Sequence, residues 1–333
     1  MNPFRFVIVG CGRMGLAHSA RLASHPEATL VGFFDPDIEA SRELQRRFAP
    51  DAEVADSFED LLQIEADAVV IATPTTEHRE QVQAAAERGW HVLCEKPLAE
   101  SRSSIDVLCE LAENRPDLHF QLGYQRRFWT PYCRMKAEIE SGSHGNVRAV
   151  VSVSAEKWQQ TIADTWRDDP EINFGGFLGD AGSHKIDMLF YVTGLAAQSV
   201  FAVSSQAGSH VEILTSVSGT LSNGATLTMS QTGLANSFTE ELFVHCEHAD
   251  LILRDGELWL GCDNERTRIE TPPDEFGAAS IRNPVSGFLD LLSGRCGNVA
   301  PFSCARPVFD LTEAILESAS SRQVVTLPPE TNQ

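Results

Sequence analysis

The stretch RFVIVGCGRMG, residues 5–15, joins a short apolar run to the glycine pattern G-x-G-x-x-G. The run from Arg5 to Val9 predicts a buried strand, and the residues from Met14 to Ser24 predict the helix that follows it. Between a strand and a helix, such glycines allow a tight turn and let the backbone approach a pyrophosphate at the helix amino end. The stretch therefore predicts the first unit of a dinucleotide-binding sheet.

Asp35 supports this interpretation from the end of the second predicted strand. It follows Gly15 by 20 residues, the spacing at which an acidic residue binds the ribose hydroxyls of a dinucleotide. A carboxylate there repels the 2′-phosphate of NADP, and no arginine lies between Asp35 and Asp37. We therefore predict NAD as the cofactor, with NADP less favoured.

Strands and helices alternate as far as residue 123. The predicted strands after the first run from Leu30 to Phe34, Asp67 to Ala72, His91 to Cys94 and His119 to Gly123, and the helices between them from Ile38 to Phe48, Glu77 to Arg88 and Ser104 to Asn114. Strands that alternate with helices of about a dozen residues imply βαβ units and a parallel sheet.

The pattern then changes to long segments in which apolar and polar residues alternate. Examples are Val147 to Lys157 and Ala225 to Thr232, and the turns Asn223-Gly224 and Asp255-Gly256 predict hairpins. Helices are expected near Ser183 to Val192, Ile281 to Leu292 and Pro307 to Ser320, covering one face of the resulting sheet. The fold class is α/β, with a doubly wound Rossmann domain at residues 1–122 and an α+β domain with a large, mostly antiparallel sheet at residues 123–333.

Lys96 is the first candidate for chemistry, because it stands in Glu95-Lys96-Pro97 directly after an apolar strand. The chain has only four lysines against 22 arginines. Open α/β sheets bind ligands at the carboxyl ends of their strands, where a lysine can hold a substrate hydroxyl or help to move its proton. Taken alone, the residue also fits a solvated lysine in a turn.

Asp180 and His184 form the second candidate, four residues apart in a glycine-rich segment. On a helix that begins near Gly182 or Ser183, His184 shares a face with Asp187. A carboxylate beside a histidine fixes its tautomer and supports proton transfer near neutral pH. The spacing suits a helix N-cap region with a half-buried histidine equally well.

Two further groups follow strand ends. Thr73-Pro74 closes a buried strand and is expected to line the nicotinamide side of the crevice, while His78 suits either a cofactor contact or a capping or solvated histidine. In Gly123 to Phe128, the paired arginines 126 and 127 offer donors to cofactor or substrate, or an ion-pair network between the domains.

Composition excludes several classes of protein. The formal charge of −21 would repel nucleic acid and anionic membrane, and no apolar run approaches the ~20 residues that span a bilayer. Only Phe6 to Val9 are consecutively apolar near the start, which is too short for a signal peptide. The eight cysteines form no Cys-x-x-Cys pair and no cluster at zinc spacing, so they predict reduced thiols, no metal site and a cytoplasmic protein.

Taken in order, these motifs resemble the family of glucose-fructose oxidoreductase, inositol dehydrogenase and their relatives. The motifs are Gly10 to Gly15 with His18, Asp35, Ala72-Thr73-Pro74 with His78, Glu95-Lys96-Pro97, Gly123 to Phe128, Trp166-Arg167 and Asp180 to Asp187. The resemblance implies a nicotinamide cofactor between two domains, a second domain that binds substrate and assembles subunits, and dimers or tetramers formed through sheet faces or edges. It also implies a catalytic set of Lys96, Asp180 and His184.

The resulting site prediction has two further sets. The predicted cofactor residues are Gly10, Gly12, Arg13, Met14, Gly15, Asp35, Thr73, Pro74, His78, Glu95, Gln125 and Arg126. The predicted substrate residues are Lys96, Lys157, Trp166, Arg167 and His184, with Trp158 as another pocket candidate. Phe177 replaces a glycine found in many members and is expected to narrow the pocket, and Ala181 argues against inositol itself as substrate.

These predictions describe a metal-free, NAD-dependent oxidoreductase that interconverts a secondary alcohol and a ketone on a sugar, polyol or cyclitol. Two alternatives remain open. One is an NADP-dependent reductase of a keto-sugar or an imine, and the other is a regulator that binds a dinucleotide and a protein partner without turnover.

Overall fold

The computed structural model describes residues 2–271 and 283–328, and these form two compact units. Among the described residues, the first unit contains residues 2–124 and 283–303, and the second contains residues 125–271 and 304–328. The observed change of unit after Tyr124 lies close to the expected boundary after residue 122. The sequence did not indicate the return of residues 283–303 to the first unit.

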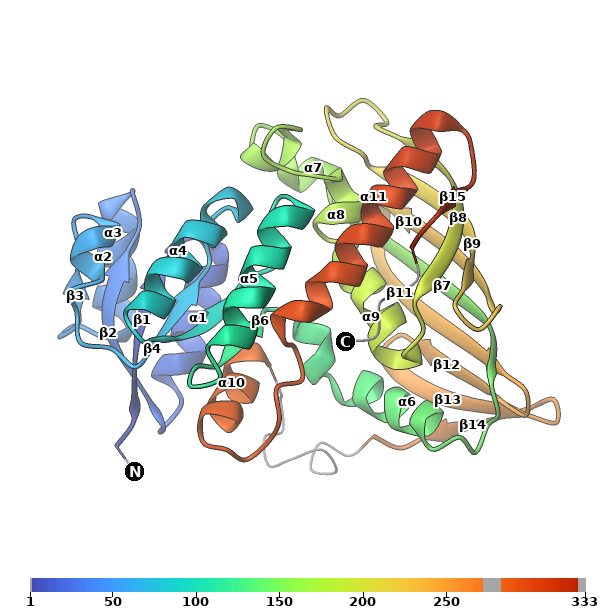
Figure 1. The fold of residues 1–333 in the computed structure, drawn as a ribbon, viewed down its shortest axis with the longest axis horizontal. Coiled ribbons are helices and arrows are strands. Elements are labelled where there is room, and N and C mark those ends of the chain that lie inside the picture. The colour runs from blue at the N-terminus through green and yellow to red at the C-terminus, as the bar shows by residue number, and fades with distance from the viewer. Residues whose placement is uncertain (1, 272–282, 329–333) are drawn as a thin grey trace. The chain divides into compact units, whose positions relative to one another are not determined.

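The first unit holds a parallel sheet of six strands in the order β3-β2-β1-β4-β5-β6 (Figure 1). The strands are β1 (Phe4–Val9), β2 (Ala28–Phe34), β3 (Glu53–Val54), β4 (Ala68–Ile71), β5 (His91–Cys94) and β6 (Phe120–Leu122). The helices between them are α1 (Arg13–Ala23), α2 (Ile38–Phe48), α3 (Phe58–Leu61), α4 (Thr75–Glu87) and α5 (Arg102–Asn114). This strand order is that of a Rossmann sheet, so the predicted fold of this unit is confirmed.

Burial on both faces explains the apolar strands of this sheet. All four residues of β4 are buried, as expected where helices cover both faces of a parallel sheet. The order reverses between β1 and β4, and in open α/β sheets ligands bind beside such a reversal, at the carboxyl ends of the strands.

Helix α10 (Pro284–Leu292) corrects one expectation. The predicted helix from Ile281 to Leu292 was expected to cover the second sheet, but α10 belongs to the first unit. Asn283 caps it with a capping box, and Phe288 packs edge-on against Phe6 of β1 with ring centroids 6.2 Å apart. The apolar stripe of α10 is therefore part of the core of the parallel sheet, while Ile281 and Arg282 lie outside the described residues.

The second unit is built on a sheet of nine strands in the order β14-β13-β12-β11-β7-β10-β9-β8-β15. The strands are β7 (Val147–Lys157), β8 (Ala197–Ser205), β9 (Leu214–Leu221), β10 (Thr226–Thr232), β11 (Leu234–Cys246), β12 (Asp250–Arg254), β13 (Glu257–Cys262), β14 (Glu265–Ile269) and β15 (Val325–Thr326). Among the described strands of this second sheet, only the pairing of β7 with β10 is parallel. The predicted large, mostly antiparallel sheet is confirmed.

Turn chemistry and helices complete this unit. Gly224 and Gly256 have φ values of +84° and +78° in the predicted β9–β10 and β12–β13 hairpins. Helices lie along one face of the sheet in Figure 1, and the larger ones are α6 (Thr130–Glu140), α9 (Ser183–Thr193) and α11 (Ala305–Ser321). The short elements are η1 (Gln125–Phe128), α7 (Gln159–Ile162), η2 (Trp166–Asp168) and α8 (Gly176–Gly179), with η3 (Phe302–Cys304) at the change of unit. None of the helices in residues 2–271 and 283–328 combines the length and apolar character that a bilayer crossing requires.

Candidate functional site

The glycine loop between β1 and α1 is shaped for close approach by a phosphate. Gly10 has a φ of +86°, and a Cβ on it would lie 2.7 Å from the carbonyl carbon of Ala72. A Cβ on Gly15 would lie 2.0 Å from the Gly10 carbonyl oxygen, so helix and strand pack too closely for a side chain. Gly12 differs, because no described atom lies within 4 Å of its Cβ position. Open space over Gly12 at the start of α1 fits the pyrophosphate of a dinucleotide.

Asp35, at the end of β2, holds this loop in place. Its Oδ2 accepts the N–H of Cys11 at 2.7 Å, and its Oδ1 accepts the N–H of Asp37 at 2.9 Å. Asp37 in turn caps α2 by accepting the N–H of Glu39 at 3.1 Å. The residue predicted to bind the ribose is therefore also a brace for the glycine loop.

The strand register places three predicted segments at one edge of the sheet. Val9 of β1 pairs with Ile71 of β4, and Ile71 pairs with Cys94 of β5. Val9, Ile71 and Cys94 therefore form a row across the three strands. Two residues further along each strand, at its carboxyl end, the chain has Cys11 in the glycine loop, Thr73 and Lys96. The half-buried Lys96 therefore follows the strand that neighbours β4, on the edge where the glycine loop lies.

The remaining predicted cofactor residues near these loops differ in exposure. Arg13 is exposed and Met14 half-buried at the start of α1. Thr73 and Pro74 join β4 to α4, and the Thr73 hydroxyl donates to Oε1 of Gln81 at 2.6 Å. These side chains lie at the loop edge predicted for the cofactor.

His78 is buried, with 1% of its surface exposed, so the solvated alternative is wrong. Its Nδ1 lies 3.0 Å from the carbonyl oxygen of Pro97 and its Nε2 lies 3.0 Å from that of Thr73. Burial lowers the pKa of His78, so the ring is neutral and donates one N–H. The His78 ring therefore lies between the loop after β4 and the loop after β5 and donates to one of them, and cofactor contact by His78 stays a prediction.

The side chain of Glu95 points into the protein interior and is buried. Its Oε1 lies 2.7 Å from Nε2 of His18 on α1, and a Cβ on Gly123 would lie 3.0 Å from its carboxyl group. Burial acts to raise the pKa of Glu95, but the hydrogen bond with His18 and the charge of Lys96 outweigh it and lower the pKa. Glu95 is therefore a buried anion that links the helix of the glycine loop to the backbone beside Lys96.

In the second unit, α9 positions the predicted catalytic pair. It begins at Ser183, so His184 occupies its second position, and both Asp180 and His184 have 8% of their surface exposed. Oδ2 of Asp180 accepts the Nε–H of Arg167 at 3.0 Å, and the Ser183 hydroxyl donates to the Asp180 carbonyl oxygen at 2.7 Å. Arg167, predicted as a substrate residue, is therefore a partner of the predicted catalytic carboxylate.

The other predicted substrate residues divide between surface and core. Lys157 is exposed at the end of β7. Trp166 is half-buried, and the guanidinium carbon of Arg167 lies 4.2 Å from the centroid of its ring. Trp158 and Phe177 instead pack edge-on at 5.4 Å in an apolar cluster of this unit. The expectation that Phe177 narrows a substrate pocket is wrong, because its side chain is completely buried in the core.

The paired arginines both make buried ion pairs within the second unit, although Gln125 and Arg126 were predicted to bind the cofactor. Arg126 donates to both carboxylate oxygens of Glu240 at 2.5 Å, and Arg127 donates to both oxygens of Asp187 at 2.7–3.0 Å. Removing one member of such a pair typically costs about 3–5 kcal/mol, because the other charge stays buried. The described contacts of Arg126 and Arg127 are therefore with carboxylates of the same unit. The side chain of Asp187, which was expected on the same helix face as His184, is bound by Arg127.

Sequence reasoning missed a cluster of ionisable side chains beside Arg126. Nζ of Lys185 lies 2.9 Å from Glu156 and 3.0 Å from Glu240, and the Tyr132 hydroxyl donates to Glu240 at 2.5 Å. Burial acts to raise the pKa of Glu240, but Arg126 and Lys185 lower it to about 2. A lysine inside the apolar helix 183–193 was the only sequence signal for this cluster.

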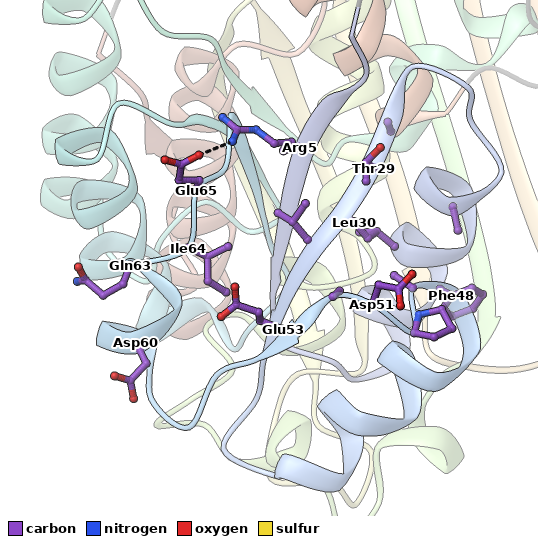
Figure 2. A pocket seen from close by; sticks show the side chains of 16 residues that line it. Arg5, Thr29, Leu30, Phe48, Asp51, Glu53, Asp60, Gln63, Ile64 and Glu65 are labelled. Atoms are coloured by element: carbon purple, nitrogen blue, oxygen red, sulfur yellow. Dashed lines mark hydrogen bonds and ion pairs between the residues drawn. The ribbon is translucent and has the colours of Figure 1, made fainter.

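A hollow of about 810 Å³ opens at the other end of the parallel strands (Figure 2). Its lining includes Arg5 and Thr29, at the amino ends of β1 and β2, together with Asp51 and Glu53. Arg5 is ion-paired with Glu65 at 3.0 Å, as the dashed line in Figure 2 shows. None of the predicted site residues lines this hollow, so it is separate from the glycine-loop edge.

Each of the two units matches a model of a known protein family. Residues 4–124 match the model described as an oxidoreductase family with an NAD-binding Rossmann fold, and residues 132–252 match a GFO/IDH/MocA C-terminal domain. Rhizopine catabolism protein MocA of Rhizobium meliloti is 31% identical over 58% of this chain and 58% of its own length. Inositol 2-dehydrogenase of Mycolicibacterium gilvum is 33% identical over 44% of this chain. The chain spans only 42–58% of the length of these two curated relatives.

Solved structures match over nearly the whole chain. Levoglucosan dehydrogenase in complex with NADH has a TM-score of 0.86 at 23% identity and covers 98% of this chain and 100% of its own. An NAD-binding protein from Listeria innocua has a TM-score of 0.79 at 25% identity, over 98% of this chain and 97% of its own. These likenesses establish the fold of both units.

Proposed function

The chain belongs to the GFO/IDH/MocA family of oxidoreductases, and from this premise we propose that it interconverts a secondary alcohol and a ketone on a sugar, polyol or cyclitol with NAD. The observation that carries the proposal is the register that brings Lys96 to the same sheet edge as the glycine loop and Asp35. Relatives named inositol 2-dehydrogenase, levoglucosan dehydrogenase and glucose-6-phosphate 3-dehydrogenase support this substrate class.

Each predicted catalytic residue has one role in this proposal. Lys96 donates a hydrogen bond to the substrate oxygen and stabilises negative charge on it. His184 accepts the hydroxyl proton, and Asp180 stabilises the imidazolium that forms. NAD, bound with its pyrophosphate at the glycine loop, would supply the acceptor for the hydride. Positioned proton transfer of this kind contributes roughly 10²–10⁴-fold to the rate.

The proposed function is tested by following NADH absorbance across a panel of inositols, aldoses, sugar acids and amino sugars. Turnover of at least one polyhydroxylated alcohol with NAD supports it. Tight NAD binding without turnover of any compound contradicts it and favours a dinucleotide-sensing regulator instead.

Asp35 gives a prediction about cofactor choice. We expect Asp35→Ser to weaken NAD binding at least tenfold, because the variant loses the ribose ligand and an acceptor for the Cys11 N–H. NADP should bind the variant more tightly than it binds the original chain, since the repelling charge is gone. Fluorescence titration with both cofactors measures the change, and Asp56→Ser, on a loop of the same unit, is the control. Preference of the original chain for NADP would contradict the role of Asp35.

The face of the second sheet opposite α6, α9 and α11 is the surface on which we propose that copies of this chain pair. A cross-strand row of uncharged side chains runs over seven strands: Phe201, Ser218, Thr228, Val151, Phe243, Ile252 and Trp259. An uncharged row suits a second copy of a chain with a net charge of −21, because like charges do not meet there. Seven neighbouring strands span about 29 Å across the sheet, and strands of seven residues are about 23 Å long. The face of the sheet therefore has an area of about 700 Å², close to the ~800 Å² that each partner buries in a stable interface.

Thr228 on β10 is the third residue of this row, next to the central Val151 on β7. We expect Thr228→Glu to weaken self-association at least tenfold, since it buries an unpaired charge in the interface. Sedimentation velocity over a range of concentrations measures the change. Thr29→Glu, at an exposed position of β2, is the matched control. A monomeric original chain, or a variant that associates equally well, would contradict the interface.

A further inference from the structure

The turn that leads into Asp180 rests directly on Glu212. Gly175 and Gly176 have φ values of +80° and +59°, and a Cβ on Gly176 would lie 2.3 Å from the carbonyl oxygen of Glu212. The N–H of Phe177 donates to the same oxygen at 2.8 Å. Glycine at position 176 is therefore needed for the contact, and the turn is held against residue 212 by its backbone.

The carboxyl group of Glu212 adds a second hold on this turn. Its Oε2 accepts the N–H of Leu178 at 2.8 Å, and its Oε1 lies 2.6 Å from the hydroxyl of Thr215 on β9. Leu178 stands two residues before Asp180, in the single-turn helix α8 whose first N–H groups have no partner within the helix. Glu212 thus connects the sheet to the segment that carries Asp180 and His184.

Within residues 2–271 and 283–328, no charged side chain contributes to the electrostatics of the Glu212 carboxyl group. The side chain has 8% of its surface exposed. Elements α8, β9 and β10 have no ionisable residue, and the residues on either side of Glu212 are Val211 and Ile213. On α11 the side chain that faces the turn is Thr312, next to Gly175. Burial raises the pKa of Glu212 to about 7, even though its two hydrogen bonds act to lower it.

We infer that Glu212 is a positioning residue that, as a neutral acid, clamps the turn before Asp180 onto the sheet, and that loss of its proton loosens this clamp. In the neutral form Oε2 of Glu212 accepts the Leu178 N–H, and Oε1 stays hydrogen-bonded to the Thr215 hydroxyl. Ionisation places an anion without a cation in the same space, which favours entry of water and opening of the turn. The catalytic consequence, through Asp180 and His184, rests on the proposed function.

The sign of the pH dependence follows from the raised pKa. Between about pH 4.5 and 7 the unfolded chain ionises this residue while the folded chain still binds the proton. The stabilisation is therefore complete below pH 4.5 and is lost as the pH rises through 7. Glu212→Gln keeps the shape without the charge. We expect its apparent Tm to exceed that of the original chain by about 3 °C at pH 8.5, with the difference shrinking towards pH 5.

A measurement that does not depend on enzymatic activity tests the contact between Glu212 and the turn. The amide signal of Leu178, observed by nitrogen-15 NMR with leucine labelling, should titrate with a midpoint near pH 7 in the original chain and should not titrate in Glu212→Gln. Glu265→Gln removes one exposed charge from β14 and is the matched control. A Leu178 signal that is constant from pH 5 to 9 in the original chain would overturn the inference, whether or not the chain is a dehydrogenase.

Catalysis provides the second measurement, once the substrate screen has identified a substrate. We expect the ratio of kcat for Glu212→Gln to kcat for the original chain to rise about threefold or more between pH 6 and 8.5. A purely structural effect would leave this ratio constant with pH, and that outcome would overturn the positioning role. Failure of the substrate screen would instead contradict the proposed function and leave the Leu178 titration as the deciding measurement.

Discussion

Replacing Lys96 with methionine is expected to lower kcat about 10³-fold on the true substrate, while the affinity for NAD changes no more than about twofold. Methionine is unbranched and only one heavy atom shorter than lysine, and it removes the charge and the hydrogen-bond donors. The loss falls on kcat because the negative charge on the substrate oxygen develops in the transition state, where the ammonium acts most strongly. Stopped-flow single turnover and fluorescence titration of NAD separate the two quantities.

Two variants make this experiment specific. Lys136→Met removes an ammonium that forms an ion pair with Glu140 on α6, and it should leave kcat and NAD affinity unchanged. Lys96→Arg restores the charge with a planar head group, so we expect only partial recovery of kcat. Turnover of Lys96→Met within about threefold of the original chain would refute the role of this lysine.

Much of the first unit could be predicted because its signals are local in sequence. The strand–glycine–helix stretch at residues 5–15 contains both the turn and the helix start, and Asp35 follows at a fixed spacing. The register of the parallel sheet then brings Lys96 to the same edge, as alternating strands and helices imply. Backbone requirements of this kind are readable from residue types alone.

The roles of the buried ionisable groups could not be predicted, because their partners lie far away in sequence. Arg126 is 114 residues from Glu240, and Arg127 is 60 residues from Asp187. A pair of arginines after a strand indicates donors, but not whether a ligand or a carboxylate of the same chain receives them. His78 shows the same limit, since only the folded loops reveal the carbonyl oxygens around its ring.

The position of helix α10 and the burial of Glu212 are two further features that could not be predicted from the sequence. The apolar stripe of α10 fits either sheet equally well by pattern, and Phe288 settles the choice only by packing against Phe6. Glu212 stands at the start of an alternating segment, where an acidic residue is expected to face solvent. Its burial under the turn at Gly176 depends on a close backbone contact that no sequence period encodes.

Replacing His184 with asparagine is expected to lower kcat by 10²–10⁴-fold, the range typical for loss of a positioned proton acceptor. Asparagine keeps a hydrogen-bonding side chain of similar reach but does not take up a proton near neutral pH. The deficit should be smaller at alkaline pH, because hydroxide then replaces the missing base. The measurement is the pH profile of kcat between pH 6 and 10, with Lys96 intact.

Added imidazole distinguishes a lost base from a disturbed helix. His184 is buried at the start of α9, so shortening it to glycine should create a space that small bases enter. We expect imidazole to raise the turnover of His184→Gly at least tenfold in a saturable manner, and to leave Lys96→Met unchanged. His248→Asn, at an exposed position after β11, controls for general effects of histidine loss and should behave as the original chain. Undiminished turnover of His184→Asn would remove this residue from the mechanism, because a proton acceptor that can be deleted without loss is not the acceptor.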